Sequence, residues 1–226
     1  MDNSIAFKKP EVLFFDINET ILDTYSLRAK INGFFEADVY DLWFTKLLHY
    51  SLVHSAAGSF SGFSHLAENA LYAVSSIIGK DMPDSFLLEI TGVLSSLPAL
   101  PDVVSSLEIL NKKGYSIVAL SNSSEALLAE QLSNADISYL VDRRISAEHF
   151  GKYKPHPEVY TGAAKLMGFK NEDCMLAAVH DWDVFGAISA GLKGAYITRG
   201  TQNKYYNFLI KPDVVARDLI SLSERL

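Results

Sequence analysis

Four groups of polar residues directly follow hydrophobic or loop segments, and their types could together carry nucleophilic catalysis. They are Asp16 after Val12-Leu13-Phe14-Phe15, the pair Ser121-Asn122, Lys154, and the group His180 to Asp183. A carboxylate can attack carbon, a lysine ammonium can keep that carboxylate ionised, and a histidine titrates near neutrality and can activate water. A single Asp after a strand is most often a turn or helix cap. The catalytic interpretation therefore depends on the four groups occurring together.

Alternating apolar runs and amphipathic segments predict the elements that bring these residues together. Strands are expected at 12–15, 117–120, 175–179 and 195–198, with a fifth beginning at 214. Helices are expected at about 102–113, 124–135, 156–168 and 184–191. Such alternation is typical of an α/β fold with a doubly wound, Rossmann-like parallel sheet. In that fold, polar residues just past the carboxyl ends of the strands converge on one crevice.

The segment 24–98 has a different pattern. It shows helical periodicity and no convincing strand signal, and Pro98 and Pro101 mark its return to the alternating region. We expect a helical cap domain over 24–98, inserted after the first strand. The α/β core domain would then comprise 1–23 and 99–226.

Composition excludes several classes of protein. The 226 residues include 49% hydrophobic and 21% charged side chains, which is typical of a globular protein. A net charge of −7 argues against a nucleic-acid or anionic-membrane partner. A single cysteine, Cys174, excludes an intramolecular disulfide and a multi-cysteine zinc site. With no recognisable signal peptide and no apolar run long enough to span a bilayer, a cytoplasmic location is expected.

The four polar groups, in their order, resemble the motifs of the haloacid dehalogenase superfamily. Asp16 to Thr20 matches its Asp-x-x-x-Thr, and Ser121-Asn122, Lys154-Pro155 and the acidic group ending at Asp183 match the later motifs. The helical insertion also lies where that superfamily has its cap. The resemblance covers essentially the whole chain, and it implies an aspartate nucleophile at Asp16.

Two positions argue against the phosphatases of this superfamily. Where those enzymes have a general-acid aspartate, this chain has Asn18, whose amide cannot exchange a proton at neutral pH. Four residues before Asp183, where they have a magnesium-binding aspartate, it has Val179. Phosphoryl transfer depends on neutralising charge, so both absences count against it. We expect no metal and no cofactor.

The chain is more similar to the type II L-2-haloacid dehalogenases. Tyr153-Lys154-Pro155 with Val159-Tyr160 resembles their YKP and VY motifs, and AVHDWD, ending at Asp183, resembles their SSNAWD. Leu42-Trp43 with Lys46 and Tyr50 resembles the start of their first cap helix. A halide leaves without a proton, which agrees with the missing acid. Four positions depart from that pattern, which has Tyr, Gly, Arg and Asn where this chain has Asn18, Glu19, Phe44 and His180.

The resemblance implies hydrolysis of short-chain 2-haloacids to 2-hydroxy acids through an ester on Asp16. Lys154 would orient Asp16, Ser121 would donate a hydrogen bond to the substrate carboxylate or to Asp16, and His180 would be the base that activates water. Asp183 would position Lys154. The residues expected to contact substrate or halide are Asn18, Glu19, Thr20, Trp43, Phe44, Asn122, Tyr160 and Trp182. Among these, Glu19 would fix the tautomer of the histidine, and Trp43, Phe44 and Trp182 would form an apolar cradle for halide, with Asn122 donating to it.

Two alternatives remain open at this point. One is a magnesium-dependent phosphatase that uses Asp181 in a shifted metal position. The other is an interaction module without catalysis, which the missing arginine at Phe44 keeps open. The partners expected are a small 2-haloacid and a second copy of the chain in a homodimer, with no nucleic acid and no membrane.

Overall fold

The computed structural model describes residues 8–200, 205 and 210–226, and within them strands and helices alternate after residue 100. The strands of this part of the chain are β1 (Val12–Phe15), β2 (Ser116–Ser121), β3 (Arg143–Ser146), β4 (Cys174–Ala178), β5 (Lys193–Ile197) and β6 (Val214–Ala216). Its α-helices are α1 (Tyr25–Phe35), α2 (Tyr40–Ala57), α3 (Phe63–Ile78), α4 (Asp84–Ser95), α5 (Val103–Lys112), α6 (Glu125–Asn134), α7 (Pro157–Met167), α8 (Asp181–Ser189) and α9 (Leu219–Arg225). Three short 3₁₀ segments are η1 (Ser138–Leu140), η2 (Ala147–Phe150) and η3 (Asn171–Asp173).

The strands form one parallel sheet in the order β3-β2-β1-β4-β5-β6. From β1 the chain runs outward through β2 and β3, then crosses to the other side of β1 for β4, β5 and β6. The connections therefore reverse direction between β1 and β4. In open α/β sheets, ligands bind at the carboxyl ends of the strands at such a reversal. Asp16 follows β1 and His180 lies two residues after β4, so both stand at this point.

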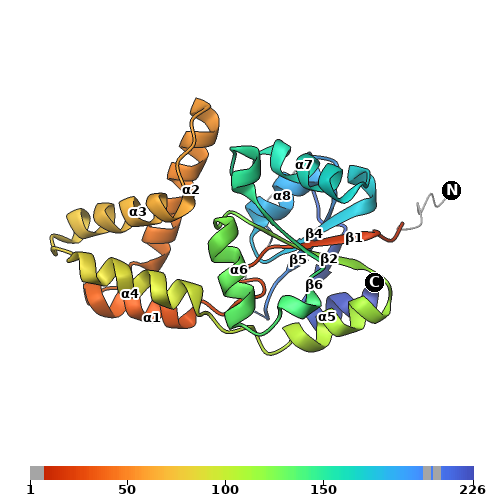
Figure 1. Ribbon diagram of the computed structural model, residues 1–226, viewed down its shortest axis with the longest axis horizontal. Helices are drawn as coiled ribbons and strands as arrows, with labels where there is room; N and C mark the ends of the chain where they lie inside the picture. The colour runs from red at the N-terminus through yellow and green to blue at the C-terminus, as the bar shows by residue number, and fades with distance from the viewer. Residues whose placement is uncertain (1–7, 201–204, 206–209) are drawn as a thin grey trace.

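Helices cover both faces of the sheet. Figure 1 shows α7 and α8 above the strands, and α5 below them. Helix α9 packs against α5, so it lies on the same side. All four residues of β1 and all five of β4 are buried, which explains why their sequences are continuous apolar runs.

Helices α1 to α4 lie between β1 and β2 in the sequence and project to one end of the molecule in Figure 1. Within this segment α2 packs on α3 and α1 packs on α4, while α4 also contacts α6 beside the sheet. Each helix buries an apolar stripe, which in α3 includes Leu66, Ala70 and Val74 at helical spacing. The division into a cap domain at 24–98 and a core domain remains a prediction.

The doubly wound fold and five of the strands are confirmed, and two elements differ from the prediction. Strand β3 was not predicted, because Arg143 and Arg144 are exposed and only Ile145 and Ser146 are buried, so no apolar run marks it. Helix α8 begins at Asp181 rather than near 184, so the predicted acidic loop is largely the first turn of a helix.

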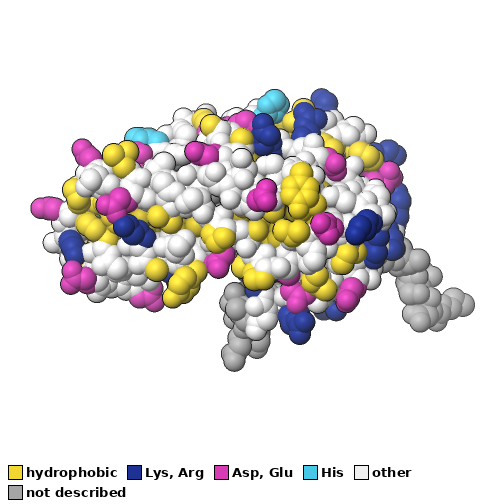
Figure 2. Space-filling model, turned by 60° about the horizontal axis from the view of Figure 1, so that its bottom comes forward, with side chains coloured by type: hydrophobic (Ala, Val, Ile, Leu, Met, Phe, Trp, Pro, Cys, Tyr) yellow, Lys and Arg dark blue, Asp and Glu magenta, His cyan; other side chains and the backbone are white. Residues whose placement is uncertain are grey.

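The surface that Figure 2 shows carries acidic and basic side chains interspersed, with hydrophobic groups between them. Within the part of the chain that the structure describes, none of the helices has the length and apolar character needed to cross a bilayer.

Candidate active site

Asp16 lies at the end of β1 and is 6% exposed. Its Oδ1 accepts a hydrogen bond from Lys154 Nζ at 2.8 Å, and its Oδ2 accepts one from Thr20 Oγ1 at 2.9 Å. The Thr20 hydroxyl in turn accepts from the backbone N–H of Val179, which ties β1 to the end of β4. Burial alone would raise the pKa of Asp16, but Lys154 and His180 hold it well below its usual range. Asp16 is therefore a carboxylate at neutral pH.

Lys154 places its ammonium between two buried carboxylates. Its Nζ lies 2.8 Å from Asp16 Oδ1 and 2.7 Å from Asp183 Oδ2, and it also donates to the Leu120 carbonyl at 3.0 Å. Burial opposes the charge, yet the two carboxylates raise the pKa of Lys154 above its ordinary value. The Asn122 amide fixes the backbone of Lys154, accepting from its N–H at 2.8 Å and donating to its C=O at 3.4 Å.

Asp183 lies in the first turn of α8 and is fully buried. Besides the contact with Lys154, its Oδ1 accepts from the Tyr160 hydroxyl at 2.5 Å. Tyr160, which was expected to contact substrate or halide, thus contacts Asp183 and is not among the residues that line the cavity beside Asp16. Burial raises the pKa of Asp183, and Lys154 opposes that rise. Tyr160 and Lys154 together fix the position of this carboxylate at the start of α8.

His180 lies between Asp16 and a second carboxylate, Glu19. The distance from its Nδ1 to Asp16 Oδ2 is 3.0 Å, and the distance from its Nε2 to Glu19 Oε2 is 2.9 Å. Burial would lower the pKa of the imidazole, but its hydrogen bonds to Asp16 and Glu19 and their charges raise it to about 10. The two carboxylates therefore favour the protonated imidazole, and the role of His180 as a base remains a prediction.

Glu19 adopts an unusual backbone conformation to make this contact. Its φ is +65°, a left-handed value that glycine adopts freely and that side chains with a Cβ adopt at some cost. The resembling enzymes have Gly here, which agrees with that conformation. The Glu19 carboxylate also accepts from the hydroxyls of Tyr40 at 3.1 Å and Thr24 at 3.3 Å. The strained residue is thus held by side chains at the start of α1 and α2.

A small cavity of about 30 Å³ opens beside Asp16. Its lining residues are Asp16, Asn18, Phe44, Leu48, Phe63, Ser121, Asn122, Lys154, His180 and Trp182. The rings of Phe44 and Trp182 both lie against His180, with centroids 5.5 and 5.2 Å from it. Phe44 and Trp182 therefore border the cavity beside Asp16, and their role as a cradle for halide remains a prediction.

Two residues of the expected halide site have other contacts. Trp43 is not among the residues that line this cavity, and its indole N–H donates to the Ala67 carbonyl at 3.0 Å. Asn122 lines the cavity, but its amide is engaged with the backbone of Lys154. Ser121 also lines it, and its Oγ accepts from the Ser123 N–H at 3.1 Å. Its hydroxyl proton is not used in that bond.

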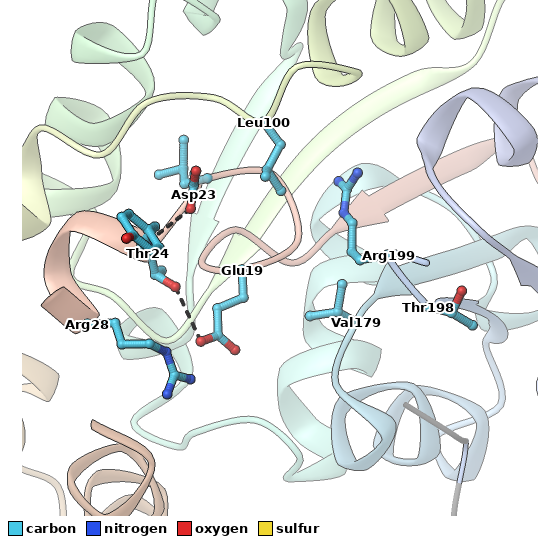
Figure 3. Close-up of a pocket in the computed structure, with 10 residues that line it drawn as sticks. Glu19, Asp23, Thr24, Arg28, Leu100, Val179, Thr198 and Arg199 are labelled. Atoms are coloured by element: carbon cyan, nitrogen blue, oxygen red, sulfur yellow. Dashed lines mark hydrogen bonds between the residues drawn. The ribbon is translucent and has the colours of Figure 1, made fainter. Parts of the chain in front are cut away.

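An open pocket of about 440 Å³ lies on the other side of Glu19. Figure 3 shows Glu19 and Arg28 on one side of it and Val179 and Arg199 on the other. Arg28 pairs with Asp41 through two hydrogen bonds. Glu19 therefore contacts the buried imidazole of His180 and also lines this open pocket.

The donor set beside Asp16 is organised around nitrogen cations. Among the residues that the structure describes, no group of three or more His, Cys, Asp or Glu side chains is arranged to hold a metal ion. Lys154 Nζ stands between Asp16 and Asp183, within 2.8 Å of a carboxylate oxygen of each.

Residues 10–191 match the model of the haloacid dehalogenase-like hydrolases. The chain belongs to that family. It is 26% identical over 223 residues to an (S)-2-haloacid dehalogenase of Pseudomonas putida, with 97% of each chain covered.

Solved structures of this hydrolase family share the fold. The L-2-haloacid dehalogenase of Xanthobacter autotrophicus with chloropropionic acid covalently bound superposes with a TM-score of 0.87 at 21% identity, covering 95% of this chain and 97% of the other. A putative HAD-hydrolase from Bacillus subtilis bound to magnesium superposes with a TM-score of 0.79 at 16% identity, covering 97% and 99%. The fold is therefore common to a dehalogenase and to a hydrolase that binds magnesium, so the fold alone does not determine the chemistry.

Proposed function

We propose that this hydrolase removes halide from short-chain 2-haloacids and releases 2-hydroxy acids, through a covalent ester on Asp16 and without a metal ion. The observation that carries the proposal is the position of Lys154 Nζ, 2.8 Å from Asp16 and 2.7 Å from Asp183. A lysine ammonium here supplies the positive charge that keeps the nucleophile ionised. The names of the relatives, (S)-2-haloacid dehalogenases, support the same substrate class.

In the first step a carboxylate oxygen of Asp16 attacks C2 of the substrate from the side opposite the halogen. The new C–O bond replaces the carbon–halogen bond, and the halide leaves with the bonding electron pair, so C2 is inverted. Phe44 and Trp182 give the leaving halide a polarisable, apolar environment. The Ser121 hydroxyl, which lines the same cavity, donates to the substrate carboxylate.

In the second step water attacks the carbonyl carbon of the Asp16 ester, and His180 accepts its proton. Formation of the ester removes the negative charge of Asp16, which is one of the two charges that raise the pKa of His180. The imidazolium then releases its proton and becomes a base. Hydrolysis returns the carboxylate and a protonated His180, so each cycle consumes one water and produces one halide and one proton.

An isotope experiment tests the covalent step. Enough enzyme for a single turnover is mixed with 2-bromopropionate in H₂¹⁸O, and the oxygen of the product and of Asp16 is analysed by mass spectrometry. We expect unlabelled lactate and one ¹⁸O in the peptide that contains Asp16. Labelled lactate in the first turnover would contradict an ester on Asp16.

Substitution and chelation complete the test. Asp16→Asn should abolish halide release, by at least about 10³-fold, because an amide is not a nucleophile at neutral pH. Halide release by the wild-type enzyme from bromoacetate should be the same with and without EDTA. Phosphate release from p-nitrophenyl phosphate that stops with EDTA, together with no halide release, would favour the phosphatase instead.

A further inference from the structure

A buried glutamine on α6 contacts the side chain of Asn18, which lines the cavity beside Asp16. Gln131 is 0% exposed, and its Nε2 donates to Asn18 Oδ1 at 3.1 Å and to the Leu94 carbonyl of α4 at 2.9 Å. Its own Oε1 accepts no hydrogen bond. A buried carbonyl oxygen without a partner is uncommon and destabilises a fold, and an apolar side chain of the same size would avoid this cost. Packing alone therefore does not account for a glutamine at this position.

The Leu94 carbonyl determines which way both amides face. A carbonyl oxygen only accepts hydrogen bonds, so the end of the Gln131 amide beside it has to be the NH₂ group. The same NH₂ group faces Asn18, so the atom of Asn18 that meets it is the acceptor Oδ1. The NH₂ group of Asn18 is therefore the end of the amide that points away from Gln131. It donates to none of the residues that the structure describes.

Other nitrogen donors beside Asp16 are already engaged. Lys154 directs its ammonium at two carboxylates and a backbone carbonyl, and both ring nitrogens of His180 face carboxylates. The Asn122 amide is held by the backbone of Lys154. Asn18 lines the same cavity, and no described residue accepts from its two N–H groups. Its amide is therefore available to a ligand in this cavity.

The leaving halide is the part of the substrate that most needs such a donor. Negative charge develops on the halogen as the carbon–halogen bond breaks, and an N–H group aimed at that charge stabilises the transition state. The phenyl ring of Phe44 lines the same cavity but has no donor, and it stands where the resembling enzymes have Arg. The Ser121 hydroxyl is already assigned to the substrate carboxylate. The halogen is thus the group that remains for Asn18.

We propose that the Asn18 amide donates a hydrogen bond to the halogen as it leaves, and that Gln131 is the positioning residue that turns Asn18 this way. This inference rests on the proposed dehalogenation. The bonding electron pair goes to the halide, and the amide keeps its proton. A small halide accepts a hydrogen bond more strongly than a large one, because its charge lies closer to the donor. The amide should therefore assist the release of chloride more than the release of iodide.

The test compares 2-chloropropionate with 2-iodopropionate, with halide release in the first turnover measured by quenched flow. Asn18→Leu keeps a similar shape and removes the donor. Its chloride release should be slower by about ten- to hundredfold, the usual value of a hydrogen bond to a charged group. Its iodide release should be slowed less, so that the ratio of the chloride rate to the iodide rate falls by about fivefold or more.

A second variant tests the positioning by Gln131. Gln131→Met keeps the length of the side chain and lets Asn18 rotate, so the same ratio should fall by about threefold or more. Combined with Asn18→Leu it should lower the ratio no further, because it acts through that amide alone. The matched control is Asn134→Leu, since the Asn134 amide on α6 donates to the Ser95 carbonyl of α4 at 2.9 Å. It removes a neighbouring bond between the same two helices, and its ratio should match that of the wild type.

Three results would contradict the inference or its basis. Equal slowing of chloride and iodide release in Asn18→Leu would place the amide on another part of the substrate and overturn the halide contact. A ratio that Gln131→Met leaves unchanged, or that Asn134→Leu lowers equally, would overturn the positioning role. Halide release from neither substrate by the wild-type enzyme would overturn the dehalogenase proposal itself.

Discussion

At the scale of single residues, His180 places a basic imidazole between two carboxylates, those of Asp16 and Glu19. Both ring nitrogens of His180 are engaged, one by each carboxylate. Two acceptors on one imidazole are best satisfied by the imidazolium, in which both nitrogens donate. In the proposed reaction, formation of the ester removes the negative charge of Asp16, although an ester oxygen can still accept a hydrogen bond. We therefore expect His180 to change from an acid to a base once Asp16 is esterified.

This change predicts that a proton is released together with the halide. Glu19 reaches from the imidazole to the open pocket in Figure 3, which gives the proton a route to solvent. In a stopped-flow experiment with a pH indicator, the first turnover should release about one proton per active site at the rate of halide release. The same measurement on His180→Asn should show halide without this proton. A wild-type proton that appears only with the 2-hydroxy acid would contradict the change of role.

The His180→Asn variant also tests the base in the second step. Asp16 can still be alkylated, so halide should appear as a burst of about one equivalent per site. Steady turnover should then fall by roughly 10²- to 10⁴-fold, the usual contribution of general base catalysis. Quenched-flow halide measurements followed by mass spectrometry of the trapped ester distinguish the two phases. Unchanged turnover would remove His180 as the base.

The sequence predicted these residues unequally, for physical reasons. Asp16 and Lys154 stand in short motifs whose backbone positions fix where the side chains go. The contact between Glu19 and His180 was also expected, but the left-handed backbone at Glu19 that accompanies it is not indicated by the residue type alone. Trp43 and Asn122 were assigned to halide, but packing among helices and the backbone of Lys154 determines their contacts. The hydroxyl of Ser123 is buried without a hydrogen-bond partner, and nothing in the sequence indicates this.

At the scale of elements, helix α8 depends on a close approach to α7 and the Lys154-Pro155 segment. A Cβ built on Gly186 would lie 2.4 Å from Pro155 Cβ and 2.7 Å from the Tyr160 hydroxyl. Asp183, one turn earlier on α8, contacts that same hydroxyl. Glycine at position 186 therefore sets the distance between α8 and the residues that position the active site.

Gly186→Ala should lower both stability and activity. The added methyl group has to displace Pro155 or Tyr160, and we expect a loss of about 1–3 kcal/mol in the free energy of unfolding. A matched control is Gly33→Ala in α1, where nothing lies within 4 Å of the added Cβ. That variant should gain roughly 0.5–1 kcal/mol, because alanine favours helix. Urea unfolding measures both changes, and equal effects of the two variants would refute the packing argument.

The predicted elements follow the same division between local pattern and packing. Strands β1, β2, β4 and β5 are interior strands, so continuous hydrophobic runs in the sequence predicted them. Strand β3 lies at an edge, where half of its residues face solvent and the run is lost. The start of α8 was placed too late because its first turn carries Asp181 and Asp183. Acidic residues favour the amino end of a helix, and that signal was interpreted as a loop.

At the scale of the whole molecule, the four departures from the resembling dehalogenases meet at one place. Glu19 pairs with His180, and Phe44 lies against His180. Asn18, Phe44 and His180 all line the cavity beside Asp16. The positions come from the loop after β1, from α2 and from the end of β4. His180 contacts both Glu19 and Phe44, while Asn18 accepts a hydrogen bond from Gln131 and lines the same cavity as Phe44 and His180. Three of the departures thus change the contacts around one side of Asp16, while Lys154 is retained on the other.

The altered charges should make stability depend on pH in a defined window. The pKa of His180 is raised from an ordinary value near 6.5 to about 10 in the folded protein. A raised pKa contributes stability that is fully present below about pH 6.5 and is lost as the pH rises through 10, because the folded state binds the extra proton. The pKa values of Asp16 and Glu19 are lowered, so their contribution is lost instead as the pH falls below their ordinary range near 4. The loss of stability on the alkaline side, between about pH 6.5 and 10, therefore reports on the protonation of His180.

We expect the wild-type protein to be more stable than His180→Asn at pH 7, and this difference to shrink steadily toward pH 10. Its size at pH 7 should be on the order of a few kcal/mol. Urea unfolding of both proteins at several pH values between 6.5 and 10 measures it, and other groups that titrate in this range are common to both chains. A third curve, from Glu19→Gln, should begin its decline at lower pH than the wild type, because loss of the Glu19 charge lowers the pKa of His180. Parallel curves for the wild type and His180→Asn across this range would show that the imidazole is not held as a cation.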